Sequence, residues 1–169
     1  LGGKVRPKAL CAGYGYPIDP ANGLSPAEIP AVFARRAREI VAEQDAQWFE
    51  FKIARHDLDT DIATILATRE ALGPSGRIAV DANMAYTVPQ ATRMLEAVAP
   101  ARLDNFEEPV AGLADLAALR RKHGVPMSTH CTLVDAVRPY PEIDAVASDP
   151  PLHGGIGGTV NLMREVAAA

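Results

Sequence analysis

The sequence predicts an α/β protein, a parallel (β/α)₈-type barrel in which about six of the eight β/α units are present and no amino-terminal capping domain precedes them. Two observations carry this prediction. A short apolar segment followed by an amphipathic helix recurs six times in 169 residues. Strands joined in this order by helical crossovers are parallel. A polar side chain also stands at or near the end of successive predicted strands, namely Lys52, Asp81, Glu107, His130 and Asp149.

The first unit begins with a strand predicted over residues 8–16. After a turn-rich stretch, Ser25 has the character of a helix N-cap, Pro26 suits the first helical position, and Glu28 completes a capping box. We therefore expect a helix from Pro26 to about Gln44. In the second unit we expect a strand over residues 48–54 and a helix that starts after Asp57 and stops at Gly73-Pro74.

The later units follow the same rules. Thr87 and Gln90 form a second capping box, the helix they open should end at Pro100, and Gly124 should close the helix after it. The remaining strands are predicted over residues 77–81, 103–107, 127–130 and 145–149, and the remaining helices over 113–123, 133–137 and from about 159 to the end. We expect residues 1–169 to form one partial barrel domain.

Composition narrows the class of protein. The net charge of −4 argues against a nucleic-acid or anionic-membrane partner. No apolar run approaches the roughly 20 residues that span a bilayer. Cys11 and Cys131 give neither a disulfide framework nor a zinc spacing, so we expect two buried thiols in a reducing compartment and a cytoplasmic location.

Two architectures fit parallel β/α units: an open doubly wound sheet and a closed barrel. In a barrel the five strand-end side chains would converge on one mouth, whereas in an open sheet they would spread along a row. No glycine-rich phosphate loop follows the first strand, which leaves the nucleotide-binding version with little support. We therefore prefer the barrel.

The strand-end residues suit a hard divalent cation. Asp81 and Glu107 would supply two carboxylates, and His130 lies where a third ligand would come from the next strand. Such a cation can hold a substrate carboxylate and neutralise the charge that develops when the adjacent carbon loses a proton. Lys52 could act as a base or an electrostatic helper, and Asp149 could orient a histidine base.

These segments also resemble a known family. Phe51-Lys52-Ile53, Val80-Asp81-Ala82-Asn83, Phe106-Glu107-Glu108-Pro109, the segment 125–130 and Ser148-Asp149-Pro150 with His153-Gly154-Gly155 resemble strand-end motifs of the enolase superfamily, in its mandelate racemase/muconate lactonizing enzyme-like and glucarate dehydratase branches. The resemblance implies that Asp81 and Glu107 bind Mg²⁺, with Mn²⁺ as the alternative and His130 in the third ligand position. It places Lys52 and Asp149 in the catalytic set. Asn83, Glu108 and His153 would face the substrate or stand behind the ligands.

The sequence departs from the family pattern in three places. The usual second lysine of the strand-2 motif is Ala54, which cannot take a proton. His130 replaces an asparagine or an acid, and imidazole is a less usual ligand for Mg²⁺. The chain ends after the sixth unit, before the strand that carries the family's histidine base. We expect a fragment of a longer gene product; a deliberately shortened protein and a part completed by another chain remain open.

The resemblance implies an acid-sugar dehydratase, a lyase that removes the proton next to a carboxylate and then expels the β-hydroxyl. The Ser128-Thr129-His130 segment, similar to the fifth strand of glucarate dehydratases, favours this reaction. A racemase, epimerase or other isomerase of the superfamily is the nearest alternative, and a non-catalytic barrel fragment completed by another chain is a further one. We expect a small-molecule carboxylate substrate and, for the full-length form, a homo-oligomer.

Overall fold

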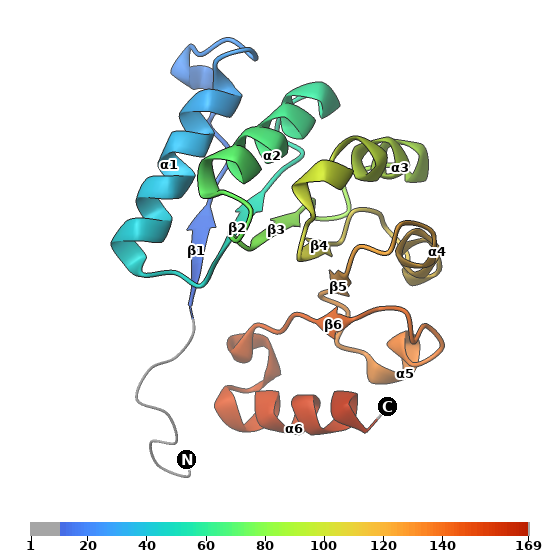
Figure 1. The fold of residues 1–169 in the computed structure, drawn as a ribbon. Coiled ribbons are helices and arrows are strands. Elements are labelled where there is room, and N and C mark those ends of the chain that lie inside the picture. The colour runs from blue at the N-terminus through green and yellow to red at the C-terminus, as the bar shows by residue number, and fades with distance from the viewer. Residues whose placement is uncertain (1–10, 169) are drawn as a thin grey trace. The chain divides into compact units, whose positions relative to one another are not determined.

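The structure is a computed structural model that describes residues 11–168. Strands and helices alternate along the chain (Figure 1). The strands follow one another across the sheet in chain order, β1-β2-β3-β4-β5-β6. A doubly wound sheet reverses its strand order at a switch point, whereas a barrel keeps the chain order. The strand order therefore confirms the barrel-type prediction.

The elements lie close to their predicted positions. The strands are β1 (Ala12–Gly15), β2 (Trp48–Lys52), β3 (Ile78–Asp81), β4 (Asn105–Glu107), β5 (Met127–Thr129) and β6 (Ala145–Val146). The α-helices are α1 (Ile29–Gln44), α2 (Leu58–Leu72), α3 (Val88–Ala97), α4 (Leu113–His123), α5 (Val134–Val137) and α6 (Ile156–Ala167). Short 3₁₀ turns are η1 (Pro20–Asn22), η2 (Ala99–Ala101) and η3 (Pro150–His153). No helix within residues 11–168 is long and apolar enough to cross a bilayer.

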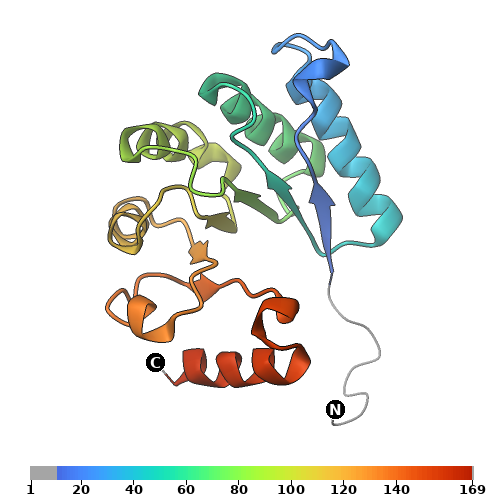
Figure 2. The same ribbon diagram turned by 180° about the vertical axis from the view of Figure 1, so that it is seen from behind.

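The chain divides into two compact units, an amino-terminal unit (Leu1–Ala79) and a carboxyl-terminal unit (Val80–Ala169). In the amino-terminal unit, β1 and β2 pair in parallel, and α1 packs against α2 (Figure 2). The rings of Phe49 and Phe51 lie 5.6 Å apart, and Phe33 of α1 packs 4.9 Å from Phe51. Gly15 fits against these rings because it has no side chain: a Cβ there would lie 2.6 Å from the Phe49 ring. The aromatic cluster thus holds α1 on the two strands.

The carboxyl-terminal unit is built around short strands, of which β4 and β5 are mostly buried and β6 is not. β4 pairs in parallel with β5, with Phe106 opposite Met127, and β5 pairs in parallel with β6. Buried apolar side chains from its strands and helices form the core, including Val80, Met94, Leu95, Phe106, Leu116 and Met127. Burying a large apolar side chain contributes about 1.5–3 kcal/mol, so these residues hold the helices over the strands.

Helix starts were predicted well where a side chain caps the backbone. Asp57 accepts a hydrogen bond from Thr60 N (3.0 Å) at the start of α2. Thr87 and Gln90 form the predicted capping box of α3. The prediction for the first helix was wrong by three residues, because α1 begins at Ile29 and not at Pro26.

The hydrogen bonds of Ser25 explain the late start of α1. Its hydroxyl donates to the Glu28 carboxylate (2.6 Å), and Glu28 N donates to the Ser25 carbonyl. Residues 26–28 consequently form a turn before the helix. The hydroxyl and then the backbone N–H of Ser25 lower the pKa of Glu28, which keeps this turn's acceptor ionised.

Several strand predictions were too long. The first strand ends at Gly15, and its predicted residues 8–10 lie outside the described part of the chain. β3, β4 and β5 are shorter than predicted by one, two and one residues. The prediction of the sixth strand was wrong over most of its length, because β6 covers only Ala145–Val146 and not 145–149. Cys131 N, which could extend the β5–β6 ladder, donates instead to Thr129 Oγ1 (3.0 Å).

Two further predictions need correction. The last helix begins at Ile156, three residues earlier than predicted. Gly158 permits this start, because a side chain there would collide with the His153 carbonyl. Cys11 is exposed and Cys131 is half-buried, so the prediction of two buried thiols was wrong. Both residues lie outside the strands, Cys11 before β1 and Cys131 after β5, where the core does not enclose them.

Candidate active site

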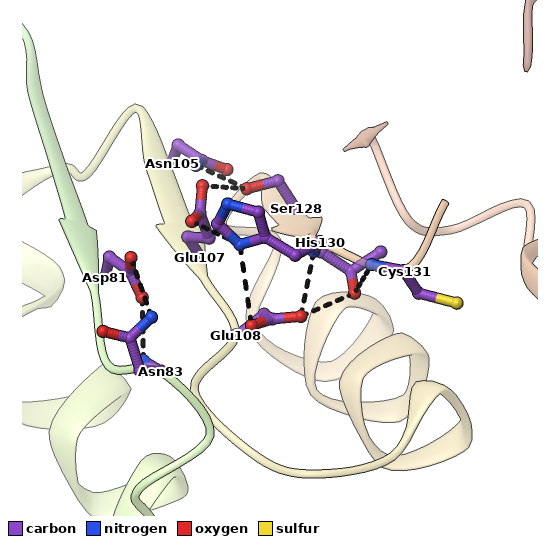
Figure 3. A network of polar contacts seen from close by, with 9 residues as sticks. Asp81, Asn83, Asn105, Glu107, Glu108, Ser128, His130 and Cys131 are labelled. Atoms are coloured by element: carbon purple, nitrogen blue, oxygen red, sulfur yellow. Dashed lines mark hydrogen bonds and ion pairs between the residues drawn. The ribbon is translucent and has the colours of Figure 1, made fainter. Parts of the chain in front are cut away.

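Two buried carboxylates end consecutive strands of the chain (Figure 3). Asp81 is the last residue of β3 and is 1% exposed, and Glu107 is the last residue of β4 and is 7% exposed. The backbone joins the two strand ends, because Ala82 N donates to the Glu107 carbonyl (3.1 Å). Ionised carboxylates are rarely buried without donors or a cation. Their burial at strand ends therefore marks this edge of the carboxyl-terminal unit as a candidate site.

Asn83 holds the Asp81 carboxylate from the loop that follows β3. Its backbone N–H donates to Asp81 Oδ1 (2.7 Å) and its side-chain amide donates to Oδ2 (3.2 Å). Asn83 and Met84 both have positive φ angles, 47° and 62°. Such angles are uncommon in residues other than glycine, although asparagine tolerates them better than most. The strained turn brings both amide donors of Asn83 onto one carboxylate.

Glu107 contacts β5 and the residue that follows this strand. Ser128 Oγ lies 3.4 Å from Glu107 Oε2, and Asn105 Nδ2 donates to Ser128 Oγ (2.8 Å). His130 Nδ1 lies 3.1 Å from Glu107 Oε1. Asn105 and Ser128 were absent from the predicted site. Their signal in the sequence was only their position, because Asn105 lies two residues before Glu107 and Ser128 two residues before His130.

Glu108 fixes the end of β5. Its Oε1 accepts a hydrogen bond from Thr129 Oγ1 (2.9 Å) and another from His130 N (2.9 Å). Thr129 Oγ1 in turn accepts from Cys131 N. Glu108 is 7% exposed and has a φ of 41°, and Met84 N donates to its carbonyl (2.7 Å). Glu108 therefore positions other residues: it holds the turn that carries His130.

His130 is placed by two acids. Its Nδ1 lies 3.1 Å from Glu107 Oε1 and 3.7 Å from Glu108 Oε2, and its side chain is 38% exposed. A ring nitrogen that donates to a carboxylate leaves the other ring nitrogen as the available acceptor. Within residues 11–168, no three His, Cys, Asp or Glu side chains lie close enough together to hold a metal ion. Metal ligation by His130 thus stays a prediction, and in the structure His130 pairs with the acid that it was expected to join as a ligand.

The donor chemistry of the two carboxylates nevertheless fits a hard cation. Mg²⁺ prefers carboxylate oxygens and usually keeps several waters, so two acids on consecutive strand ends are a sufficient protein contribution in many sites. The contacts of Asn83 with Asp81 and of Ser128 with Glu107 are the outer hydrogen bonds that orient such ligands. Asp81 and Glu107 are therefore the residues that could hold the ion.

The other predicted residues are Lys52, at the end of a strand, and Asp149 and His153, which follow β6. Lys52 is the last residue of β2, which ends two residues before the predicted end at Ala54, and it is half-buried in the amino-terminal unit. Asp149 lies three residues beyond β6, is exposed, and makes no side-chain capping bond to η3. His153 ends η3 and is half-buried. Of the predicted residues, the structure thus brings Glu107, Glu108 and His130 into one network, and Asn83 onto Asp81.

Comparison with known proteins identifies the family. The family model "Enolase C-terminal domain-like" matches residues 32–169. An o-succinylbenzoate synthase from Thermobifida fusca is 33% identical over 147 residues, which is 82% of this chain and 46% of the synthase.

Solved structures agree with this match. A structure of an isomerase from Streptomyces coelicolor A3(2) matches 99% of this chain and 47% of its own, with a TM-score of 0.85 and 28% identity. A racemase from the same organism, with bound magnesium, matches 93% of this chain and 44% of its own, with a TM-score of 0.72 and 26% identity. The chain thus spans just under half the length of these relatives. On this family match and this shared fold, the chain belongs to the enolase superfamily, as part of its C-terminal barrel domain.

Proposed function

We propose that the protein carrying this chain is a divalent-metal-dependent lyase that dehydrates an acid sugar. The proposed reaction removes the proton next to a carboxylate and then expels the hydroxyl on the following carbon. The observation that carries the proposal is the pair of buried strand-end carboxylates, Asp81 and Glu107. Membership of the enolase superfamily and the magnesium bound to a related racemase are consistent with a metal at this pair.

The chemistry divides between the bound ion and the side chains. When bound, a divalent cation stabilises the negative charge that develops on the substrate carboxylate. Asp81 and Glu107 would hold it, with Asn83 and Ser128 fixing the orientation of the two acids. Buried, pre-oriented acids need little rearrangement when the ion arrives, which favours tight binding.

The proton and the hydroxyl then have to be moved. A base takes the proton from the carbon next to the carboxylate, and the electron pair of the broken carbon–hydrogen bond moves toward the carboxylate. That electron pair then forms a carbon–carbon double bond as the carbon–oxygen bond on the next carbon breaks. The protonated base returns its proton to the departing hydroxyl, which leaves as water. Lys52 would act as a base or an electrostatic helper, and Asp149 would orient a histidine base in the longer protein. Ala54 offers no base on the second substrate face, which disfavours a racemase.

A second candidate is an activity like that of o-succinylbenzoate synthases. Its support is the 33% identity to the Thermobifida fusca enzyme over 147 residues. The fifth-strand segment Ser128-Thr129-His130, which is similar to that of glucarate dehydratases, favours the acid-sugar dehydratase. Both candidates would use the same two carboxylates.

The test is exchange of the substrate proton. The full-length protein that carries this chain should catalyse magnesium-dependent exchange of the α-proton into deuterated water with at least one aldarate or aldonate, followed by dehydration. Formation of o-succinylbenzoate, measured in parallel, would favour the second candidate. If no acid sugar exchanges its α-proton, the dehydratase proposal is wrong.

The variant Asp81→Asn tests whether α-proton exchange depends on a metal ion bound by Asp81. It should weaken Mg²⁺ binding by about a hundredfold, which is about 2.7 kcal/mol, and abolish exchange, because a neutral amide replaces a buried anionic ligand. Titration calorimetry measures the affinity. Asp115→Asn is the matched control, since Asp115 is exposed on α4. Unchanged affinity in Asp81→Asn would remove this residue from the ligand set.

A further inference from the structure

The amino-terminal unit contains a cavity that the proposed reaction does not use. It lies beside the carboxyl ends of β1 and β2, which face the same edge because the two strands are parallel. Its volume is about 420 Å³, within the range of small-molecule sites. It is lined by Tyr16, Pro17, Ile18, Asp19 and Arg55.

A strained turn sets the position of Arg55. Ala54, which comes two residues after the end of β2, has a φ of 65°, an angle that costs about 1–3 kcal/mol in a residue with a side chain. Ala54 N donates to Asp61 Oδ2 (3.0 Å), and Asp61 is 3% exposed in the first turn of α2. Such strain persists only where the surroundings fix it, and here a buried carboxylate does so. The next residue, Arg55, is consequently held at the cavity.

The Arg55 guanidinium is available to a ligand. Arg55 is exposed and makes no hydrogen bond or ion pair with any residue that the structure describes. Asp19, which also lines the cavity, accepts from Ala21 N (2.8 Å), and Asp57, two residues after Arg55, accepts from Thr60 N (3.0 Å). Neither acid is committed to Arg55.

The other walls indicate what kind of anion fits. Tyr16 presents an exposed phenol, and its ring meets Tyr14 edge-on at 5.2 Å. Pro17 and Ile18 are apolar. A guanidinium recognises a planar carboxylate through two parallel hydrogen bonds, and the apolar wall favours an anion that carries carbon over an inorganic one.

We propose that this cavity is a subsite for a small organic carboxylate, bound through Arg55 with the Tyr16 hydroxyl as a second donor. The subsite rests on the amino-terminal unit alone and holds whether or not the protein is the lyase proposed above. Its ligand class is an aliphatic carboxylic acid, for which succinate is a convenient probe.

Binding is measured by NMR titration of the side-chain Nε–H resonance of Arg55 and of the Tyr16 ring resonances in the labelled full chain. Succinate should shift both signals saturably. Arg55→Gln should weaken succinate binding at least tenfold, followed through the Tyr16 ring, and Tyr16→Phe severalfold, followed through Arg55. Arg36→Gln, a matched change at an exposed arginine of α1, should leave the affinity unchanged.

Three outcomes would overturn the subsite. Succinamide or inorganic phosphate could bind as tightly as succinate, which would deny carboxylate recognition. Arg36→Gln could weaken succinate binding as much as Arg55→Gln, which would mean that succinate is attracted by the positive charge of the surface and not by a specific site. The signals could also fail to saturate. Because none of these readouts uses catalysis or Mg²⁺, failure of the lyase proposal and failure of the subsite are distinguishable.

Discussion

The carboxyl ends of β5 and β6 are neighbours in the sheet, yet they are built in different ways. The end of β5 is held by Glu108, which binds the Thr129 hydroxyl and the His130 backbone from a buried position. Asp149, three residues past β6, is exposed, and its side chain does not cap η3. Of these two strand ends, that of β5 is the organised one, because Glu108, just after the neighbouring strand β4, accepts its hydrogen bonds.

At the amino ends of β5 and β6, an ion pair between Arg120 and Asp144 links α4 to the two strands. Arg120 of α4 binds Asp144, just before β6, through Nε (2.6 Å) and Nη2 (3.0 Å). Asp144 also accepts from Met127 N at the start of β5. This contact is bidentate but partly exposed. The pair of strands is therefore fixed by a surface ion pair at one end and by a buried carboxylate at the other, and the two should differ in strength.

The largest effect is expected from Glu108→Ala. It would leave the buried Thr129 hydroxyl and the part-buried His130 N–H without their acceptor, which costs about 2–4 kcal/mol of unfolding free energy. Urea unfolding measures the loss. Glu108→Gln, which keeps an acceptor oxygen, should recover part of it, and Glu165→Ala, an exposed acid of α6, should change little. A Glu108→Ala loss as small as that control would mean that the buried network does not hold the end of β5.

A smaller effect is expected from Asp144→Asn, about 1 kcal/mol, because solvent screens a partly exposed pair. The hydrogen bond from Arg120 is the main cause that lowers the pKa of Asp144, and the N–H of Met127 adds to it. The stabilisation is therefore full above the unfolded-state pKa of about 3.9. It is lost as the pH falls through the lower folded-state pKa.

Unfolding measured between pH 7 and pH 2 tests this sign: the difference between wild type and Asp144→Asn should shrink on acidification below about pH 4. Glu142→Gln serves as the comparison, because its partner Arg121 is more exposed. It should cost less than Asp144→Asn at pH 7. A difference that stays constant down to pH 2 would show that Asp144 acts through packing and not through its charge.

The smallest effect is expected from Asp149→Asn. Because this side chain is exposed and caps nothing, the unfolding free energy should change by less than about 0.5 kcal/mol. A loss of unfolding free energy comparable with that of Glu108→Ala would show that the ends of β5 and β6 do not differ in the way proposed. A loss of α-proton exchange without a loss of stability would instead support the catalytic role proposed for Asp149.

Local signals in the sequence determined most of the elements. Asp57, the Thr87–Gln90 box and Gly124 each act on a backbone within three or four residues, so their helix ends could be predicted. The strand-end positions of Lys52, Asp81 and Glu107 followed from the same alternation. The sequence therefore determined the barrel-type order of elements and the two carboxylates most suited to a metal ion.

The remaining features depend on contacts between residues far apart in the sequence, so only the tertiary structure could decide them. The early end of β6, the pairing of His130 with Glu107, and the role of Glu108 depend on residues about 20 positions apart in the chain, brought together across strands. Gly158 is a shorter-range case, because the carbonyl it lies against belongs to His153, five residues earlier. Spacing in the sequence can bring a polar residue to a strand end, but which donor it meets there depends on strand register and on which N–H groups the ladder leaves unused.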